Sequence, residues 1–202
     1  MGTMAAKPYH HGDLRRALVD ASIGLIGESG LDGFTLREAA RRAQVSHTAP
    51  YRHFQDKDDL LAAVAEQGFT DLSRAVEEAV ARVRLPLDRL RKSGVAYVSF
   101  ALEHTAHFRV MFGVALDPER HASARTAAEK SFEALVSIVA ECQAAGDLSP
   151  GETRKKARIA WSLVHGIAHL VIGRQLLIRT PEEVSRFVGP ATEALVNGLR
   201  NS

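Results

Sequence analysis

The stretch from residue 35 to residue 54 constrains this chain most, because its apolar spacing predicts two short helices joined by a tight turn. Thr35 and Glu38 have the spacing of a capping box, in which two side chains satisfy free backbone amides at a helix start. The apolar positions that follow at helical spacing are Leu36, Ala39, Ala40 and Ala43. These small side chains favour close packing of a neighbouring helix. Arginines occupy the other positions.

The second of these helices, expected over residues 47–53, has an unusually polar outer face. Val45 is expected to be a buried residue in the turn, and Ser46 is expected to cap the second helix. Pro50 lacks an N–H and so predicts a tight or 3₁₀-like first turn. The side chains that would be exposed are His47, Thr48, Tyr51, Arg52 and His53. Such a helix suits the donors and acceptors of the DNA major groove. An ordinary short surface helix is the alternative.

Individual roles follow from side-chain chemistry. Thr35, Tyr51 and Lys57 are candidates for phosphate contacts. The candidates for base edges are His47, Thr48, Ala49 and Arg52, and Arg52 could equally contact a phosphate. The remaining members of the expected DNA-binding set are Arg37, Ser46 and His53, of which His53 could instead cap the helix. The basic arm from Lys7 to His11, with Arg15 and Arg16, could follow the DNA backbone or simply be solvated.

Charge supports a local interaction with DNA and no strong overall field. The chain has 26 Lys and Arg against 24 Asp and Glu, a formal net charge of +2. Residues 1–57 hold eight basic and six acidic residues, so the excess lies entirely in this segment. DNA affinity must therefore come from where the cations are placed.

Other features exclude several classes of protein. Cys142 is the only cysteine, which excludes an intramolecular disulfide and predicts a buried small apolar residue more than a redox sensor. No apolar run has the length of a membrane span and no secretion signal is recognisable, so we expect a cytoplasmic protein. No nucleophile elbow, phosphate-binding loop, zinc-protease helix or carboxylate pair is present, which argues against an enzyme. No cofactor is expected.

The fold class expected from the periodicity is all-α, with about nine helices. The expected ranges are 11–29, 36–43, 47–53, 57–83, 87–104, 106–112, 118–145, 151–178 and 181–199. We expect a helix-turn-helix domain over residues 1–57 and a regulatory domain over residues 58–202. The helix that begins near Lys57 would connect them and could pass a ligand-driven shift to the recognition helix.

The chain resembles the TetR family of transcriptional regulators over nearly its whole length. The N-terminal motifs that carry the resemblance are Gly30, Gly33-Phe34-Thr35, Val45-Ser46, Tyr51-Arg52-His53-Phe54 and Asp56-Lys57-Asp58-Asp59-Leu60-Leu61. Farther on, Trp161 to Gly166 resembles the Trp-His-Gly signature of one branch of the family, and Arg109 to Gly113 fits that branch. The recognition helix departs from the commoner form, which has Gly at the position of Thr48 and an aliphatic residue at that of Pro50.

Apolar faces on the last two helices predict a dimer. The residues expected at the dimer interface are Ala157, Ala160, Val164, Ala168, Val171, Val184, Phe187, Val188, Ala191 and Leu195. In the family these helices pair with their twofold mates as a four-helix bundle, and a twofold protein implies a palindromic operator. A monomer core is the alternative use of this surface.

A mainly aromatic set of residues predicts an effector pocket in the C-terminal part. These residues are Phe100, His104, Phe108, Met111, Phe112, Phe132, Trp161, His165 and His169. A pocket histidine would titrate near neutral pH and could bind an acidic effector. Ordinary core packing is the alternative, and no complete metal-ligand set is recognisable.

Together these features predict a homodimeric repressor that binds a palindromic operator and is released by a small, largely apolar molecule. Repression, as opposed to activation, is implied only by the family resemblance. The alternative is a helical interaction or ligand-binding protein that has no specific contact with DNA.

Overall fold

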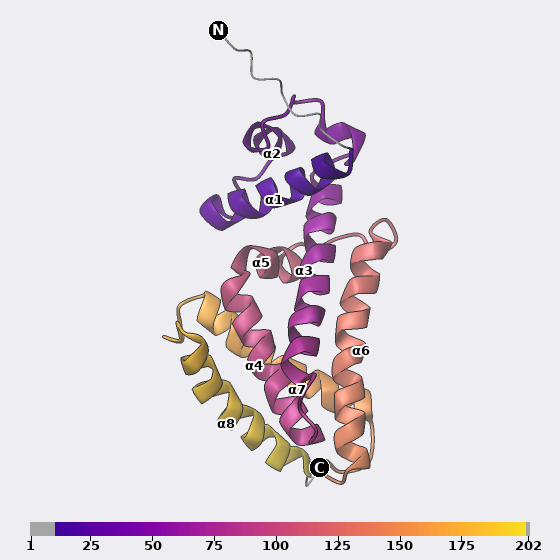
Figure 1. The fold of residues 1–202 in the computed structure, drawn as a ribbon, viewed down its shortest axis with the longest axis vertical. Coiled ribbons are helices and arrows are strands. Elements are labelled where there is room, and N and C mark those ends of the chain that lie inside the picture. Colours follow the sequence, from indigo (N-terminus) through magenta and orange to yellow (C-terminus); the bar gives the residue numbers. More distant parts are fainter. Residues whose placement is uncertain (1–10, 201–202) are drawn as a thin grey trace.

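The computed structural model describes residues 11–200, which form eight α-helices, one 3₁₀ helix and no strand (Figure 1). The expected all-α class is confirmed. The elements in chain order are α1 (His11–Ser29), α2 (Leu36–Arg42), η1 (Pro50–Arg52), α3 (Lys57–Val80), α4 (Pro86–Glu103), α5 (Thr105–Gly113), α6 (Ala122–Ala144), α7 (Thr153–Ile172) and α8 (Pro181–Arg200). Between residues 11 and 200 no helix has the length and apolarity needed to cross a membrane.

A small head is built from α1, α2, η1 and the start of α3, and α3 runs from it along the larger body (Figure 1). Leu18 and Ile26 of α1 and Phe34 of the following loop are almost completely buried. Leu60 and Val64 of α3 are equally buried and belong to the same cluster. Because α3 contributes to this cluster and then continues into the body, the two parts share one long rigid element.

The body is a bundle in which α4 lies between α3 and the last two helices. Gly94 of α4 permits close packing, since a Cβ atom there would lie 3.2 Å from Cγ1 of Val164 and 3.3 Å from Oγ1 of Thr192. A second, smaller apolar cluster closes the far end of the bundle and contains Cys142. Cys142 is completely buried, as expected, and burial raises the pKa of its thiol to about 11.

Several helix ends differ from the expected ones for local reasons. Residues 47–49 form a turn, so only Pro50–Arg52 of the expected second helix is helical, and it is a 3₁₀ helix. The helix expected from residue 118 begins at Ala122, because Asp117 Oδ1 accepts from the amides of Glu119 and Arg120 and holds a turn there. The helix expected to reach residue 178 ends at Ile172, just before Arg174 adopts a left-handed φ of 57°.

Candidate nucleic-acid interface and ligand cavity

A left-handed residue, Gln44, sets the angle between α2 and the recognition segment, which we define as residues 46–54. Its φ is 57°. The Gln44 amide donates to the carbonyl of Arg41 at 3.1 Å, and the Val45 amide donates to the carbonyl of Ala40 at 3.0 Å. This pair of hydrogen bonds is a Schellman motif, which normally has glycine at the left-handed position. Val45 is half-buried against the head core, and so is less deeply placed than expected.

The expected caps around the turn are only partly formed. Thr35 Oγ1 accepts from the Glu38 amide at 3.1 Å, as the capping box predicts. The return hydrogen bond is absent from the described contacts, because the Glu38 carboxylate binds Arg41 instead. Ser46 does not cap the second helix: its hydroxyl lies 3.2 Å from that of Thr48, and Ala49 is the N-cap residue, with no side-chain hydrogen bond.

The recognition segment divides into a buried and an exposed side. Pro50 and Phe54 are buried, and Ala49 is half-buried against the core. The side chains of the expected set that remain exposed are Ser46, His47, Thr48, Tyr51 and Arg52. His53 differs from expectation, since it is half-buried, its Nε2 has no hydrogen-bond partner in the described part of the chain, and its ring lies beside Phe54.

Intramolecular ion pairs hold most cations of the head. The guanidinium of Arg42 makes a bidentate contact with Glu28 of α1, at 2.6 and 2.7 Å. The other pairs are Arg41 with Glu38, Arg15 with Glu66 at 3.6 Å and Arg16 with Asp20 at 3.8 Å. Among the described residues of the head, only the guanidiniums of Arg37 and Arg52 have no hydrogen bond, ion pair or ring contact, and both residues are exposed.

Lys57, expected to contact a phosphate, is used inside the head. Its Nζ donates to the carbonyl oxygen of Leu31 at 3.1 Å and lies 5.6 Å from the centre of the Phe34 ring. The Lys57 side chain therefore stabilises the loop that follows α1. Lys7 and the side chain of His11, which belong to the expected basic arm, lie outside the described residues.

The body contains a cavity of about 550 Å³ lined by residues of α3, α4, α5, α6, α7 and α8. Phe112, Phe132 and Trp161 of the expected set line this cavity. Other lining residues are the apolar side chains Phe69, Leu72, Val76, Leu90, Leu135 and Ile138. Sequence reasoning missed these residues because their helical spacing is that of ordinary core positions.

The other six residues of the expected pocket do not line it. They are Phe100, His104, Phe108, Met111, His165 and His169. Phe100, Phe108 and Met111 are buried core residues, and His104 and His169 are exposed. Ring contacts join five of the six in two separate sets, Phe100 with His104, and Phe108 with His165 and His169, for example Phe108 to His169 at 5.4 Å between ring centres. Phe108 and His165 also contact Phe112 of the cavity wall, so the second set forms a layer behind that wall. In the described part of the chain no group of three or more His, Cys, Asp or Glu side chains could hold a metal ion.

A hydrogen-bonded trio joins this layer to the cavity. Trp161 Nε1 donates to the Tyr97 hydroxyl at 3.2 Å, and that hydroxyl lies 2.8 Å from His165 Nδ1. Burial lowers the pKa of His165 to about 4, with a smaller contribution from His169, and burial raises the pKa of Tyr97. His165 is therefore neutral at pH 7, and because it lies behind the wall it is not the pocket histidine that was expected to titrate near neutral pH.

Most of the residues expected at a dimer interface face the interior of the protomer. Ala157, Ala160, Val164, Ala168, Val171, Val184 and Val188 are buried. Of these, Ala160 and Val164 line the cavity, as does the half-buried Leu195. Ala191 is also half-buried, and only Phe187 is exposed, at 44%. The apolar stripe is mostly covered by α4 within one protomer, so apart from Phe187 the exposed faces of α7 and α8 consist of other residues.

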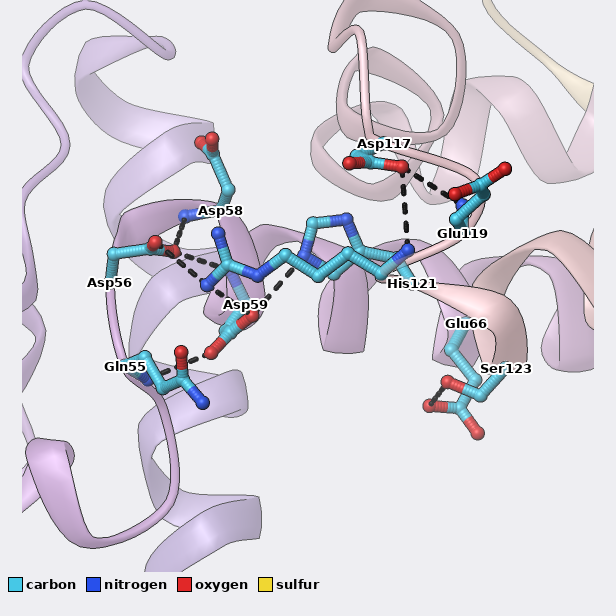
Figure 2. A network of polar contacts seen from close by, with 10 residues as sticks. Gln55, Asp56, Asp58, Asp59, Glu66, Asp117, Glu119, His121 and Ser123 are labelled. Atoms are coloured by element: carbon cyan, nitrogen blue, oxygen red, sulfur yellow. Dashed lines mark hydrogen bonds and ion pairs between the residues drawn. The ribbon is translucent and has the colours of Figure 1, made fainter.

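Polar contacts connect the loop before α6 to the start of α3 (Figure 2). Arg120 binds Asp56 Oδ2 at 2.7 Å and Asp59 Oδ1 at 2.8 Å, and His121 Nε2 lies 3.2 Å from the same Asp59 oxygen. Asp56 is the N-cap of α3, where its carboxylate accepts from the amides of Asp58 and Asp59. The Asp59 amide, followed by Arg120 and to a smaller extent the Asp58 amide, holds the pKa of Asp56 below its usual value. We call the contacts of Arg120 and His121 with Asp56 and Asp59 the head–body latch.

Family models match both parts of the chain. Residues 90–195 match the model described as the tetracyclin repressor-like C-terminal domain, and residues 18–64 match that of bacterial regulatory proteins of the tetR family. The chain belongs to the TetR family.

Individual relatives agree with this TetR family assignment. An uncharacterized helix-turn-helix-type transcriptional regulator of Haemophilus influenzae is 30% identical over 128 residues, which are 63% of this chain and 62% of that protein. The helix-turn-helix-type transcriptional regulator BetI of Burkholderia cenocepacia is 41% identical over 81 residues, which are 39% of this chain and 42% of that protein. These matches therefore span less than two thirds of each relative.

Solved structures match over a larger share of this TetR family chain. A Rhodococcus sp. RHA1 protein of unknown function has a TM-score of 0.83 and 39% identity, covering 96% of this chain and 100% of that one. FadR from Bacillus subtilis, solved with stearoyl-CoA, has a TM-score of 0.75 over 91% of this chain and 98% of that one. Its identity is 16%, which shows a shared fold alone.

Proposed function

We propose that this protein is a cytoplasmic, homodimeric repressor that binds a palindromic operator and is released when a small, largely apolar effector fills its cavity. The observation that carries the proposal is the exposed side of the recognition segment, on which His47, Thr48, Tyr51 and Arg52 are all exposed to solvent. Exposed donors on a rigid head suit base edges and phosphates. Membership of the TetR family supports this use of the segment.

Exposed apolar residues on α7 and α8 support a dimer. Ile159 and Leu170 of α7 are each 39% exposed, and Gly166 between them has open space where a Cβ would lie. Phe187 is exposed on α8. Large apolar side chains flanking a small residue let a second helix approach closely, and such surface is costly to leave in water. A twofold pairing through these helices would place two heads on the two halves of a palindrome.

The cavity supports the ligand response. Its volume of about 550 Å³ is in the range of small-molecule sites, and its walls are mainly apolar. The α6 helix contributes Phe132, Leu135 and Ile138 to the wall, and the loop before α6 carries Arg120 of the head–body latch. A ligand that displaced α6 would therefore act on the start of α3, next to the recognition segment.

Selection of bound duplexes from a random-sequence pool tests the DNA-binding part of the proposal. We expect an inverted repeat, because a twofold dimer reads the same half-site twice. Sequence-blind retention, or none, would overturn the repressor and favour a helical interaction protein.

The oligomeric state has its own test. Leu170→Glu should shift the sedimentation of the protein from dimer to monomer. Ser137→Glu, at an exposed position of α6 that does not line the cavity, is the control and should leave the dimer intact. A wild-type monomer at micromolar concentration would contradict the proposed dimer.

A further inference from the structure

The chemistry of the cavity wall restricts which effector can enter, and this inference rests on the proposed effector site. Five buried or half-buried polar side chains line the cavity, and four of them have donors that are already used. The fifth, Ser131 of α6, has no hydrogen bond of its hydroxyl in the described part of the chain. Ser93 Oγ donates to the Leu90 carbonyl at 2.8 Å, and Thr192 Oγ1 donates to the Val188 carbonyl at 2.9 Å. Trp161 Nε1 donates to the Tyr97 hydroxyl.

The fourth interior donor is the Tyr97 hydroxyl, which is also committed. Its oxygen accepts from Trp161, and with the tautomer of neutral His165 that carries its proton on Nε2, the hydroxyl proton donates to His165 Nδ1, 2.8 Å away. An acceptor atom of a ligand would therefore find a free donor only at the Ser131 hydroxyl of α6, and burying it elsewhere in the cavity would cost free energy. The part of the ligand inside the cavity must therefore be mainly apolar.

Charged residues line the cavity only where α6 and α7 are exposed. Glu133 of α6 pairs with Arg154 of α7 at 2.5 Å, and Glu129 pairs with Arg125 at 3.8 Å. Both carboxylates that line the cavity are thus neutralised by arginines, so an ammonium group gains little there. This charged stretch forms the rim of the cavity.

Arg158 is different from these rim residues. It lines the cavity and is exposed, and within residues 11–200 its guanidinium has no hydrogen bond or ion pair. It lies one helical turn after Arg154, whose guanidinium is held by Glu133 and stands 5.7 Å from the centre of the Phe132 ring. The rim therefore offers one uncommitted positive charge beside an apolar interior.

We propose that the effector is an amphipathic monoanion, a free carboxylic acid with an aliphatic or aryl body. The body fills the cavity, and the carboxylate stays at the rim and pairs with the Arg158 guanidinium. A planar guanidinium binds a carboxylate through two parallel N–H donors, so an acid is preferred to an alcohol or an amine of the same length.

The only tryptophan of the chain gives a direct signal for occupation of the cavity, because Trp161 lines it. We would titrate the purified full chain, without DNA, with dodecanoate, dodecan-1-ol, dodecylamine and dodecanoyl-coenzyme A, each below its micellar concentration. Tryptophan fluorescence reports binding, and helical circular dichroism reports that the protein stays folded. Dodecanoate should bind roughly tenfold more tightly than the alcohol or the amine, the effect of one partly exposed charge-assisted hydrogen bond.

Variants separate the charge at Arg158 from the shape of the cavity. Arg158→Gln should weaken the binding of dodecanoate roughly tenfold and leave the affinity for dodecan-1-ol unchanged. Arg158→Glu should make dodecylamine the preferred ligand. Arg84→Gln, an exposed arginine that does not line the cavity, is the control and should change nothing. Equal affinity for acid and alcohol, no effect of Arg158→Gln, tighter binding of the coenzyme A ester, or no fluorescence change with any probe would overturn the proposal.

The same probes, added to the complex with a selected duplex, distinguish this inference from the proposed function. If dodecanoate binds through Arg158 but leaves the DNA complex intact, the carboxylate site stands and the release mechanism fails. If the neutral alcohol alone releases the DNA, the release mechanism stands and the carboxylate site fails.

Discussion

Arg120, in the loop before α6, binds the carboxylate of Asp56, the residue that caps α3 directly after the recognition segment. The same guanidinium also binds Asp59, 2.8 Å away. One side chain of the body thus touches two acidic residues at the first turn of the helix that both parts share. Arg120 lies only eight residues before Ala128, the first residue of α6 in the cavity wall, so the contact joins that wall to the head.

Breaking the head–body latch should loosen the start of α3. In Arg120→Gln, native-state amide exchange of Asp58 and Asp59 should become a few-fold faster, since their acceptor Asp56 loses its ionic partner. Exchange in α8 should stay the same. Arg125→Gln is the matched control, because Arg125 pairs only with Glu129 of its own helix. Unchanged exchange at the start of α3 would show that the latch does not restrain it.

Arg52 should matter more for DNA than the paired arginines of the head. Arg52→Ala should cost about 1–3 kcal/mol of binding free energy and relax the preference at one base pair if it reads a base. Arg37→Ala should weaken binding to all DNA sequences equally, because a phosphate contact does not depend on the base sequence. Arg41→Ala should have the smallest effect, since Glu38 already holds that guanidinium. Binding of a duplex library to each variant checks this order, which a dominant Arg41 would contradict.

The free energy of unfolding should fall as the pH drops from 6.5 towards 4, partly through His165. Its folded pKa of about 4 lies below the usual 6.5, so the unfolded chain binds more protons in this window and stability rises with pH. The contribution of His165 to the free energy of unfolding is fully present above pH 6.5 and is lost as the pH falls towards 4. His165→Asn keeps an acceptor for Tyr97 and does not titrate. Urea unfolding at several pH values should give a flatter profile for this variant, and an identical slope would show that His165 is not involved.

Gln44→Gly should stabilise the protein. A left-handed conformation costs a residue with a Cβ roughly 1–2 kcal/mol, and glycine adopts it freely, although its greater unfolded-state entropy offsets part of the gain. We expect the urea midpoint to rise by the equivalent of about 1 kcal/mol with an unchanged slope. Gln44→Ala retains the strain and should show no gain. A lower midpoint for the glycine variant would mean that the Gln44 side chain itself stabilises the turn.

Local signals in the sequence predicted the local structure well. The Thr35 cap and the 3₁₀ turn at Pro50 were both correct, because each depends on neighbours within about four residues. The apolar stripe of α7 was also recognised, but the helix that packs against it was not. Val164 and Ala168 were expected at a dimer interface, whereas α4 covers that stripe within the protomer. Periodicity marks which face is apolar and does not say which element packs on it.

The candidate site shows the same division. Aromatic composition predicted a pocket, and Phe132 and Trp161 do line one, but Phe108 and His169 lie behind its wall. Arg120 was not singled out at all, because its partners Asp56 and Asp59 are about sixty residues earlier in the chain. Pairings of this kind depend on the final packing of α3 against α6, for which the sequence has no short-range signal.

The ion pairs within the head bear on how the protein would search a chromosome. Affinity for arbitrary DNA grows with the number of counterions that bound cations release from the phosphates. Carboxylates of the protein itself neutralise Arg15, Arg16, Arg41 and Arg42. Few cations of the head therefore remain to displace counterions from the phosphates. Random sites would then hold the protein only briefly and compete weakly with the operator. A small number of unpaired positive charges therefore favours sequence specificity over high affinity for DNA in general.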